Sequence, residues 1–286
     1  FHARVLTGGR LAADSPPQGE FYDNIFLVND GRWVSQYPVG HPMLLAVGVL
    51  IGDPWLVPPA LAALTVLLLA ASARELFGPA PAAVTAVLAA TSPFLIAASG
   101  TLMAHVPCLA ALALVLWTGL AASRGDRSRW WSLACAAAFG AAVLIRPSSA
   151  VAVGLPLHLL LWLRSRRLPD RWRRWPLWAA GGTAMVGLWL LLNLGTYGHP
   201  LRTGYAAYWV PQVGLRSPLG FGTFPWGIEH TPAIALATTW HSLVRLNAWL
   251  SGWPLSLLLP AAAVILCRRR ETLLLGAAAA APMVLH

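Results

Sequence analysis

Residues 102–163 read LMAHVPCLAALALVLWTGLAASRGDRSRWWSLACAAAFGAAVLIRPSSAVAVGLPLHLLLWL, and this stretch decides the fold. It holds three apolar runs, separated first by an arginine-rich turn and then by a single arginine before a proline. A helix needs about 20 apolar residues to cross the hydrocarbon core of a bilayer. The stretch therefore predicts helices that cross a membrane back and forth.

Further apolar runs bounded by charge, proline or glycine lie on both sides of this stretch. The predicted spans are residues 54–73, 79–97, 102–121, 130–145, 147–163, 175–194, 253–267 and a run from 272 onward. We predict an all-α fold, a polytopic transmembrane helix bundle whose external loops carry the site. Its predicted parts are a first external loop and approach to the membrane (1–53), the helix bundle (54–194), an external loop with an interfacial helix (195–252) and C-terminal transmembrane helices (253–286).

Composition supports a membrane protein and excludes most other classes. The chain is 57% hydrophobic and 10% charged with a mean hydropathy of +0.63, whereas a soluble domain has about 45–50% apolar and 25% charged residues. The net charge of +10 comes from arginine alone and gathers at the ends of apolar runs, which favours membrane topology over nucleic-acid binding. Cys108, Cys135 and Cys267 lack metal-binding spacing and fit a packed core.

Arginine content sorts the loops into two sides. The arginine-rich loops alternate along the chain, so they fall on one side, which the positive-inside rule makes cytoplasmic. Their arginines are Arg74, then Arg124, Arg127 and Arg129, then Arg164, Arg166, Arg167, Arg171, Arg173 and Arg174, and finally Arg268, Arg269 and Arg270. The other side receives residues 1–42, turns at Ser99 and Arg146, and residues 195–231. We expect a multi-pass protein of the inner (plasma) membrane with an external, periplasmic active face.

Residues 232–250 carry one apolar and one polar stripe at helical spacing. An interfacial helix on the membrane surface fits this split. A span that lines a wet cavity is the alternative.

Two segments before and inside the bundle hold candidate site residues. Tyr37-Pro38-Val39-Gly40-His41-Pro42 predicts a rigid, strand-like approach that presents Tyr37 and His41; a stiff connector is the alternative. His105 lies near the external end of an apolar run, where an ionisable residue is costly and marks a functional candidate, unless it only bonds within the bundle.

Arg146 stands on the arginine-poor side between two apolar runs. A planar guanidinium beside a membrane cavity suits a phosphate or pyrophosphate, although an arginine can also extend to the interface without a ligand. Aromatic and hydrogen-bonding side chains also gather where a span meets the long external loop, as a sugar requires or as a membrane belt provides. The candidates there are Asn193, Tyr197, Arg202 and Tyr205.

Taken together, the chain resembles the GT-C superfamily of polytopic glycosyltransferases, in particular the bacterial relatives of protein O-mannosyltransferases and of the lipid A aminoarabinose transferase (glycosyltransferase family 39-like). The resemblance rests on a series of landmarks spread from Phe1 to about Tyr205. They are Ala3–Leu11, Tyr37–Pro42, Arg74–Gly78, Thr91–Phe94, Ile145–Pro147 and Asn193–Leu201.

The resemblance implies transfer of a sugar from a polyprenyl-phosphate donor to an acceptor hydroxyl of a glycan, lipid or protein on the external face. A carboxylate would act as general base, and a cation, Arg146 or Arg202, would stabilise the departing lipid phosphate. Relatives carry an acidic pair just before the stretch resembling Ala3–Arg10, so we expect the base upstream of Phe1. His105 stands where several relatives place an acidic residue, and the need for a divalent metal is left open.

Two other functions remain open from the sequence. The first is a transporter or flippase for a lipid or polar solute, with His105 and Arg146 lining its path. The second is a catalytically inactive GT-C-like scaffold. The glycosyltransferase hypothesis predicts that Tyr37, His41, His105, Arg146 and Tyr197 converge on one cavity at the external membrane boundary.

Overall fold

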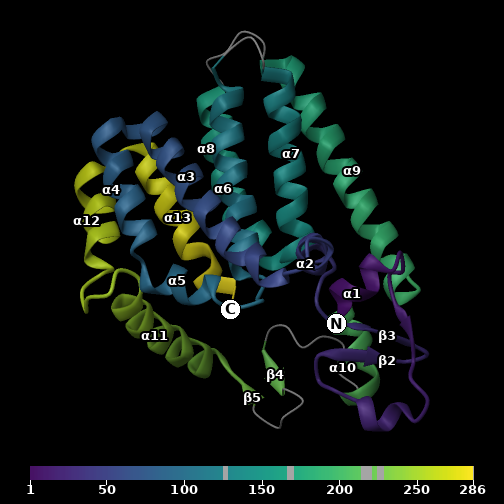
Figure 1. Ribbon diagram of the computed structural model, residues 1–286. Helices are drawn as coiled ribbons and strands as arrows, with labels where there is room; N and C mark the ends of the chain where they lie inside the picture. The colour runs from purple at the N-terminus through teal and green to yellow at the C-terminus, as the bar shows by residue number, and fades with distance from the viewer. Residues whose placement is uncertain (125–127, 166–170, 214–220, 224–228, 286) are drawn as a thin grey trace. The chain divides into compact units, whose positions relative to one another are not determined.

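The computed structural model describes residues 1–124, 128–165, 171–213, 221–223 and 229–285. In these residues the chain forms 13 α-helices and five short strands, so the predicted all-α, polytopic class is confirmed (Figure 1). The chain divides into two compact units. Unit 1 comprises Phe1–Val57 and Val186–Thr238, and unit 2 comprises Pro58–Met185 and Thr239–His286.

Unit 1 is built around a small antiparallel sheet in the order β1-β3-β2. A two-residue turn, Asp30-Gly31, joins β2 to β3, with Gly31 at φ +89°, a conformation that glycine adopts without strain. The sheet packs against α10 and the end of α9 through Val28, Val34, Tyr197, Ala207 and Tyr208. The elements are α1 (His2–Thr7), β1 (Ala13–Asp14), the 3-10 helix η1 (Gly19–Tyr22), β2 (Leu27–Asn29), β3 (Arg32–Ser35), α2 (Gly40–Leu50), η2 (Pro54–Leu56), α10 (Gly204–Val213), β4 (Gly222–Thr223) and β5 (Glu229–His230).

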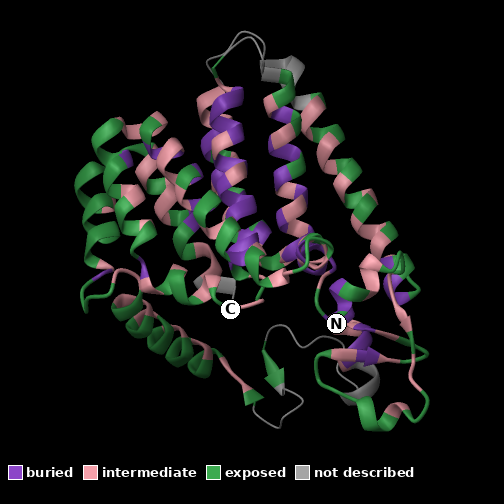
Figure 2. Cartoon of the chain, in the orientation of Figure 1, coloured by how far each residue is buried: buried purple, intermediate pink, exposed green. Residues whose placement is uncertain are grey.

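Unit 2 is a helix bundle with α6 at its centre. Of the α6 span, 72% is buried, the largest share among the candidate spans of the described chain (Figure 2). Its core includes Val115, Leu120, Cys135, Leu157 and Leu160. The helices are α3 (Val57–Phe77), α4 (Pro79–Ala90), α5 (Pro93–Ser99), α6 (His105–Ala122), α7 (Ser128–Ile145), α8 (Pro147–Ser165), α12 (Leu258–Cys267) and α13 (Arg270–Leu285); α9 (Arg171–Tyr197) and α11 (Pro232–Trp249) belong partly to each unit.

Four helices of the described chain are long and apolar enough to cross a membrane, and a fifth span is formed if α4 and α5, bent by 53°, count as one. The four are Pro54–Phe77, His105–Ala122, Pro147–Ser165 and Pro176–Tyr197. The other predicted runs form α7, α12 and α13, which are not among these candidate spans of the described chain. α11 forms over the predicted stretch with no buried residue, and its place on the membrane surface stays a prediction.

Ion pairs within unit 2 join the helix ends that carry the arginine-rich loops. Arg124, after α6, pairs with Glu75 near the end of α3. Arg164, near the end of α8, lies 3.6 Å from Glu271 in the first turn of α13. These contacts join the ends of α3 and α6, and the end of α8 and the start of α13. The alternation of arginine-rich loops along the chain predicts that these four helix ends share one side of the membrane. Arg127, Arg166 and Arg167 lie outside the described residues.

The approach to the bundle differs from the prediction. The strand-like conformation expected for Tyr37–Pro42 is wrong beyond Ser35, where β3 ends, because Gly40, His41 and Pro42 form the first turn of α2. Proline is tolerated there because the first amides of a helix have no partner inside the helix. The residues that follow continue α2 to Leu50, and the external location of residues 1–53 stays a prediction. Gly48 allows this 11-residue helix to pack closely on Pro54 and Val57.

Candidate functional site

Arg146 lies in the turn between α7 and α8, at the end of unit 2 away from the arginine-rich loops. Its Nη1 contacts Nδ1 of His105, the first residue of α6. Because α6, α7 and α8 follow one another in alternating directions, the start of α6 and the α7–α8 turn share one end of the bundle (Figure 1). The fold thus brings together two candidates that are 41 residues apart in the sequence.

The backbone of Arg146 is fixed by both neighbouring helices. Its N–H donates to the carbonyl oxygen of Ala142 in α7 at 2.8 Å, and its own carbonyl oxygen accepts from the N–H of Ala150 in α8 at 2.9 Å. Ile145, which precedes it, is buried. Pro147 at the first position of α8 has no N–H to satisfy and carries a φ that suits a helix start. The guanidinium therefore projects from a rigid turn.

Two helix N-termini add to the positive potential at this guanidinium. Both α6 and α8 begin here, and the unpaired amides of a helix start carry about half a positive charge. The acidic residues Glu75 and Glu271 lie at the opposite end. A guanidinium beside two helix starts is an arrangement that binds phosphate or carboxylate groups.

His105 can hold the guanidinium in position. Its side chain is exposed, while that of Arg146 is half-buried. Arginine only donates hydrogen bonds, so the contacting ring nitrogen must be the unprotonated acceptor of a neutral imidazole. In this arrangement His105 orients Arg146 and leaves the remaining guanidinium donors for a ligand.

The second cluster lies in unit 1 and is organised by Tyr197. This side chain is 6% exposed, and its hydroxyl donates to the carbonyl oxygens of Ser35 at 2.9 Å and Tyr37 at 3.3 Å. The Tyr37 ring meets Tyr205 edge-on at 5.8 Å and stacks on Phe26 at 6.0 Å between centroids. Partial burial raises the pKa of the Tyr37 phenol, so the hydroxyl is neutral and able to donate at physiological pH.

Arg202 is engaged inside unit 1. Its Nη2 lies 2.9 Å from Oδ2 of Asp30 in the β2–β3 turn, and its Nη1 donates to the carbonyl oxygen of Tyr197 at 3.3 Å. Asn193 is buried and donates to the carbonyl oxygen of Pro200 at 3.2 Å. Both side chains stabilise the segment that leads from α9 to α10.

The predicted site residues fall into two groups, one in each unit. Tyr37, His41, Asn193, Tyr197, Arg202 and Tyr205 belong to unit 1, and His105 and Arg146 belong to unit 2. His41 is buried in the first turn of α2. The convergence of both groups on one cavity stays a prediction.

Three residues of the unit 1 cluster are not among the predicted site residues. Asp30 pairs with Arg202, and Arg32 donates to the carbonyl oxygen of Gly195 at 2.9 Å. A Cβ at Gly204 would lie 2.2 Å from the backbone oxygen of Gln36. The Asp-Gly pair was a signal for the hairpin that positions Asp30, whereas the close approach at Gly204 has no local sequence signal.

Within the described residues, no group of three or more His, Cys, Asp or Glu side chains is placed to hold a metal ion. Three acidic residues of unit 1 make other contacts. Asp14 pairs with Arg10, Asp23 accepts from Asn29, and Asp30 pairs with Arg202.

Comparison with known proteins gives one family. The sequence model of the family described as dolichyl-phosphate-mannose-protein mannosyltransferase matches residues 38–192, more than half of the 286-residue chain. The match includes Arg146 and His105 and ends one residue before Asn193. Neither the curated proteins nor the solved structures gave a match.

Proposed function

Because this chain belongs to the dolichyl-phosphate-mannose-protein mannosyltransferase family, we propose that it transfers a sugar from a polyprenyl-phosphate donor to an acceptor hydroxyl on the external face of the membrane. Membership in the family makes the chain a multi-pass membrane glycosyltransferase. The donor, the acceptor and the side of the membrane are the proposed parts.

The observation that carries the proposal is the contact between Arg146 and His105 at the shared start of α6 and α8. A polyprenyl-phosphate donor has a single anionic group at the membrane boundary, and its charge grows when the sugar leaves. Stabilising that developing charge in a site of low dielectric constant contributes directly to the rate. Arg146 directly precedes the candidate span of α8 and contacts the first residue of the candidate span of α6. A lipid headgroup would lie at such span ends.

Arg146 is favoured over Arg202 for this role by their partners. Arg202 is paired with a carboxylate and a backbone carbonyl oxygen, so a phosphate would compete with an existing anion. Arg146 contacts an imidazole, which is neutral in this arrangement. We assign the lipid phosphate to Arg146 and a positioning role to His105.

The proposed reaction is a substitution at the anomeric carbon. The acceptor oxygen forms a bond to this carbon, the bond between the carbon and the phosphate oxygen breaks, and its electron pair leaves with the lipid phosphate. A general base takes the acceptor proton. Of the acidic residues in unit 1, Asp14, Asp23 and Asp30 make the contacts described above, and we assign the role of general base to none of these three.

Unit 1 supplies side chains that suit a sugar or its acceptor. Tyr37 is 40% exposed and Phe26 is 49% exposed, so both rings offer surface beside a phenol hydroxyl. Aromatic faces next to hydrogen-bonding groups bind the alternating apolar and hydroxyl surfaces of a sugar ring. We propose Tyr37 and Tyr205 as sugar contacts, with Tyr197 and Asn193 holding their backbone.

The test is a sided transfer assay with the full-length protein in sealed vesicles that carry polyprenyl-phosphate mannose with a labelled sugar. Labelled acceptor should form, and free polyprenyl phosphate should accumulate, only when the acceptor is added on the face where α6 and α8 begin. A tag in the segment between α6 and α7, at the opposite end of the bundle, reports the other face by protease access. Movement of intact donor across the bilayer without sugar transfer would favour a flippase instead.

A further inference from the structure

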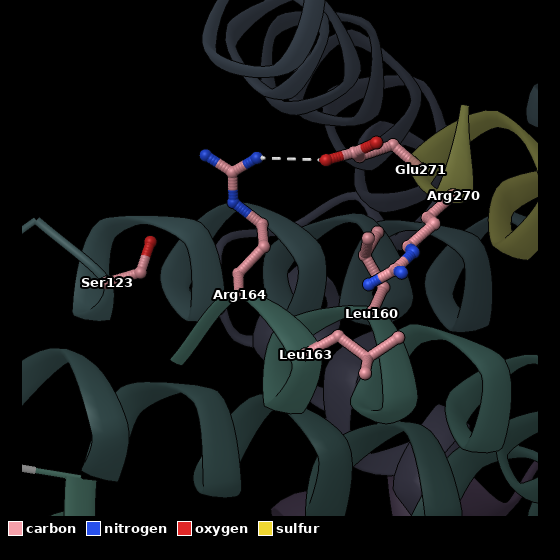
Figure 3. Close-up of a pocket in the computed structure, with 6 residues that line it drawn as sticks. All are labelled: Ser123, Leu160, Leu163, Arg164, Arg270 and Glu271. Atoms are coloured by element: carbon pink, nitrogen blue, oxygen red, sulfur yellow. Dashed lines mark ion pairs between the residues drawn. The ribbon is translucent and has the colours of Figure 1, made fainter. Parts of the chain in front are cut away.

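A cavity of about 270 Å³ lies at the arginine-rich end of unit 2, away from Arg146. It is lined by the residue after α6, the last turns of α8 and the first turn of α13 (Figure 3). The lining residues are Ser123, Leu160, Leu163, Arg164, Arg270 and Glu271. We propose that this cavity binds the phosphate of an anionic glycerophospholipid, a role separate from sugar transfer.

The lining is divided into an apolar part and a charged part. Leu160 is 1% exposed and belongs to the core of the bundle, and Leu163 lies beside it. The two guanidinium groups and the Glu271 carboxylate form the polar part (Figure 3). A lipid has the same division, with an anionic phosphate joined to apolar chains, whereas a free phosphate would leave the surface of the half-buried Leu163 unused.

The cavity lies at the depth where headgroups are found. The candidate span in α6 ends at Ala122 and the one in α8 at Ser165, and Ser123 and Arg164 line the cavity at these ends. A helix that spans the hydrocarbon core ends among the headgroups. Basic pockets between span ends on the cytoplasmic side bind anionic lipid headgroups.

The charged groups leave capacity for an anion. The distance of 3.6 Å between Arg164 Nη1 and Glu271 Oε1 exceeds that of a hydrogen bond, so this pair is loose. Arg270 makes no ion pair in the described part of the chain. α13 begins at Arg270, and the unpaired amides of this helix start add a positive potential. The lining therefore carries two guanidinium groups and a helix start but only one carboxylate.

Substitutions of Glu271 and of the two arginines should change the lipid affinity in opposite directions. A phosphate held by Arg164 must compete with the Glu271 carboxylate, so removing that charge should strengthen lipid binding. Removing either guanidinium should weaken it. General attraction of anionic lipid to a basic surface would give the guanidinium effect at any nearby arginine. Arg268, which precedes α13 and does not line the cavity, is the matched control.

The experiment is native mass spectrometry of the full-length protein in detergent, titrated with phosphatidylglycerol and, separately, with phosphatidylcholine. We expect tighter binding of phosphatidylglycerol, about tenfold weaker binding in Arg270→Gln and Arg164→Gln, and tighter binding in Glu271→Gln. Arg268→Gln should bind like the wild type, and millimolar inorganic phosphate should not displace the lipid. An equal loss in Arg268→Gln, no gain in Glu271→Gln, or displacement by inorganic phosphate would overturn the proposal.

Discussion

Replacing Tyr197 with phenylalanine tests how unit 1 positions its aromatic cluster. The hydroxyl donates one proton shared between the carbonyl oxygens of Ser35 and Tyr37, at 2.9 and 3.3 Å, in a side chain that is 6% exposed. Phenylalanine keeps the ring but leaves the Ser35 oxygen without this donor. An orphaned polar group costs about 1–3 kcal/mol, and because the Tyr37 bond is long we expect about 1–2 kcal/mol.

Hydrogen exchange of the full-length protein in detergent measures this loss locally. A cost of about 1–2 kcal/mol raises the open population about 5- to 30-fold. Backbone amides of β3 and of Gln36, whose N–H donates to the Phe26 carbonyl oxygen, should exchange faster by that factor, while α6 is unchanged.

Tyr208→Phe is the matched control for this prediction. Tyr208 is buried in the same core cluster. Among the described residues, its hydroxyl has no hydrogen-bond partner. It should leave exchange in β3 unaltered. Unchanged exchange in Tyr197→Phe, or an equal increase in Tyr208→Phe, would show that the Tyr197 hydroxyl does not hold β3 in place.

Three further predictions concern unit 1. In Gly204→Ala the new Cβ would lie 2.2 Å from a backbone oxygen. We therefore expect the free energy of unfolding of unit 1 to fall by about 1–3 kcal/mol, measured by hydrogen exchange. Gly182→Ala, with open space around its Cβ, should show no loss. Burial lowers the pKa of His2 below 6.5. The stability that the buried, neutral His2 contributes is therefore complete above pH 6.5 and is lost as pH falls through the lowered pKa. Protection of the α1 amides from hydrogen exchange should drop on acidification, and His2→Gln should remove that pH dependence. The side chains of the Asp30–Arg202 ion pair are 41% and 34% exposed, respectively. A double-mutant cycle on the free energy of unfolding should therefore give a coupling free energy below about 1 kcal/mol.

The helix bundle of unit 2 could be predicted because its signals are local. Run length predicts a span, and alternation of arginine along the chain predicts which ends share a side. The ion pairs of Arg124 with Glu75 and of Arg164 with Glu271 agree with that alternation. α2 could not be found in this way, because 11 residues that begin with glycine, histidine and proline are too short for a span.

The small sheet of unit 1 and its contacts depend on residues far apart in the sequence. β3 pairs with β1, and Tyr197 reaches Ser35 across 162 residues. No periodicity reports such contacts, and strands of two to four residues carry little pattern.

The part of the candidate site that depends only on the order and direction of the helices could be predicted from the sequence. Arg146 was recognised because it stands against the arginine bias, and alternating helices bring it to His105. The partner of Arg202 was not predictable, because Asp30 lies 172 residues away on a hairpin that also had to be placed. The tertiary fold, rather than residue type, gives the two arginines different partners.

The proposed role of Arg146 as the ligand of the lipid phosphate is tested by the rate of sugar transfer in wild type, Arg146→Lys and Arg146→Ala. The rate is measured with polyprenyl-phosphate mannose in liposomes and normalised to protein abundance. Lysine keeps the charge but loses the planar fork, and alanine loses both. Loss of a charge-assisted hydrogen bond costs about 1.5–3 kcal/mol, or about ten- to a hundredfold in rate. We expect the rate to fall in the order wild type, Arg146→Lys, Arg146→Ala, and Arg129→Ala to remain active. Full activity of Arg146→Ala at normal abundance would contradict it.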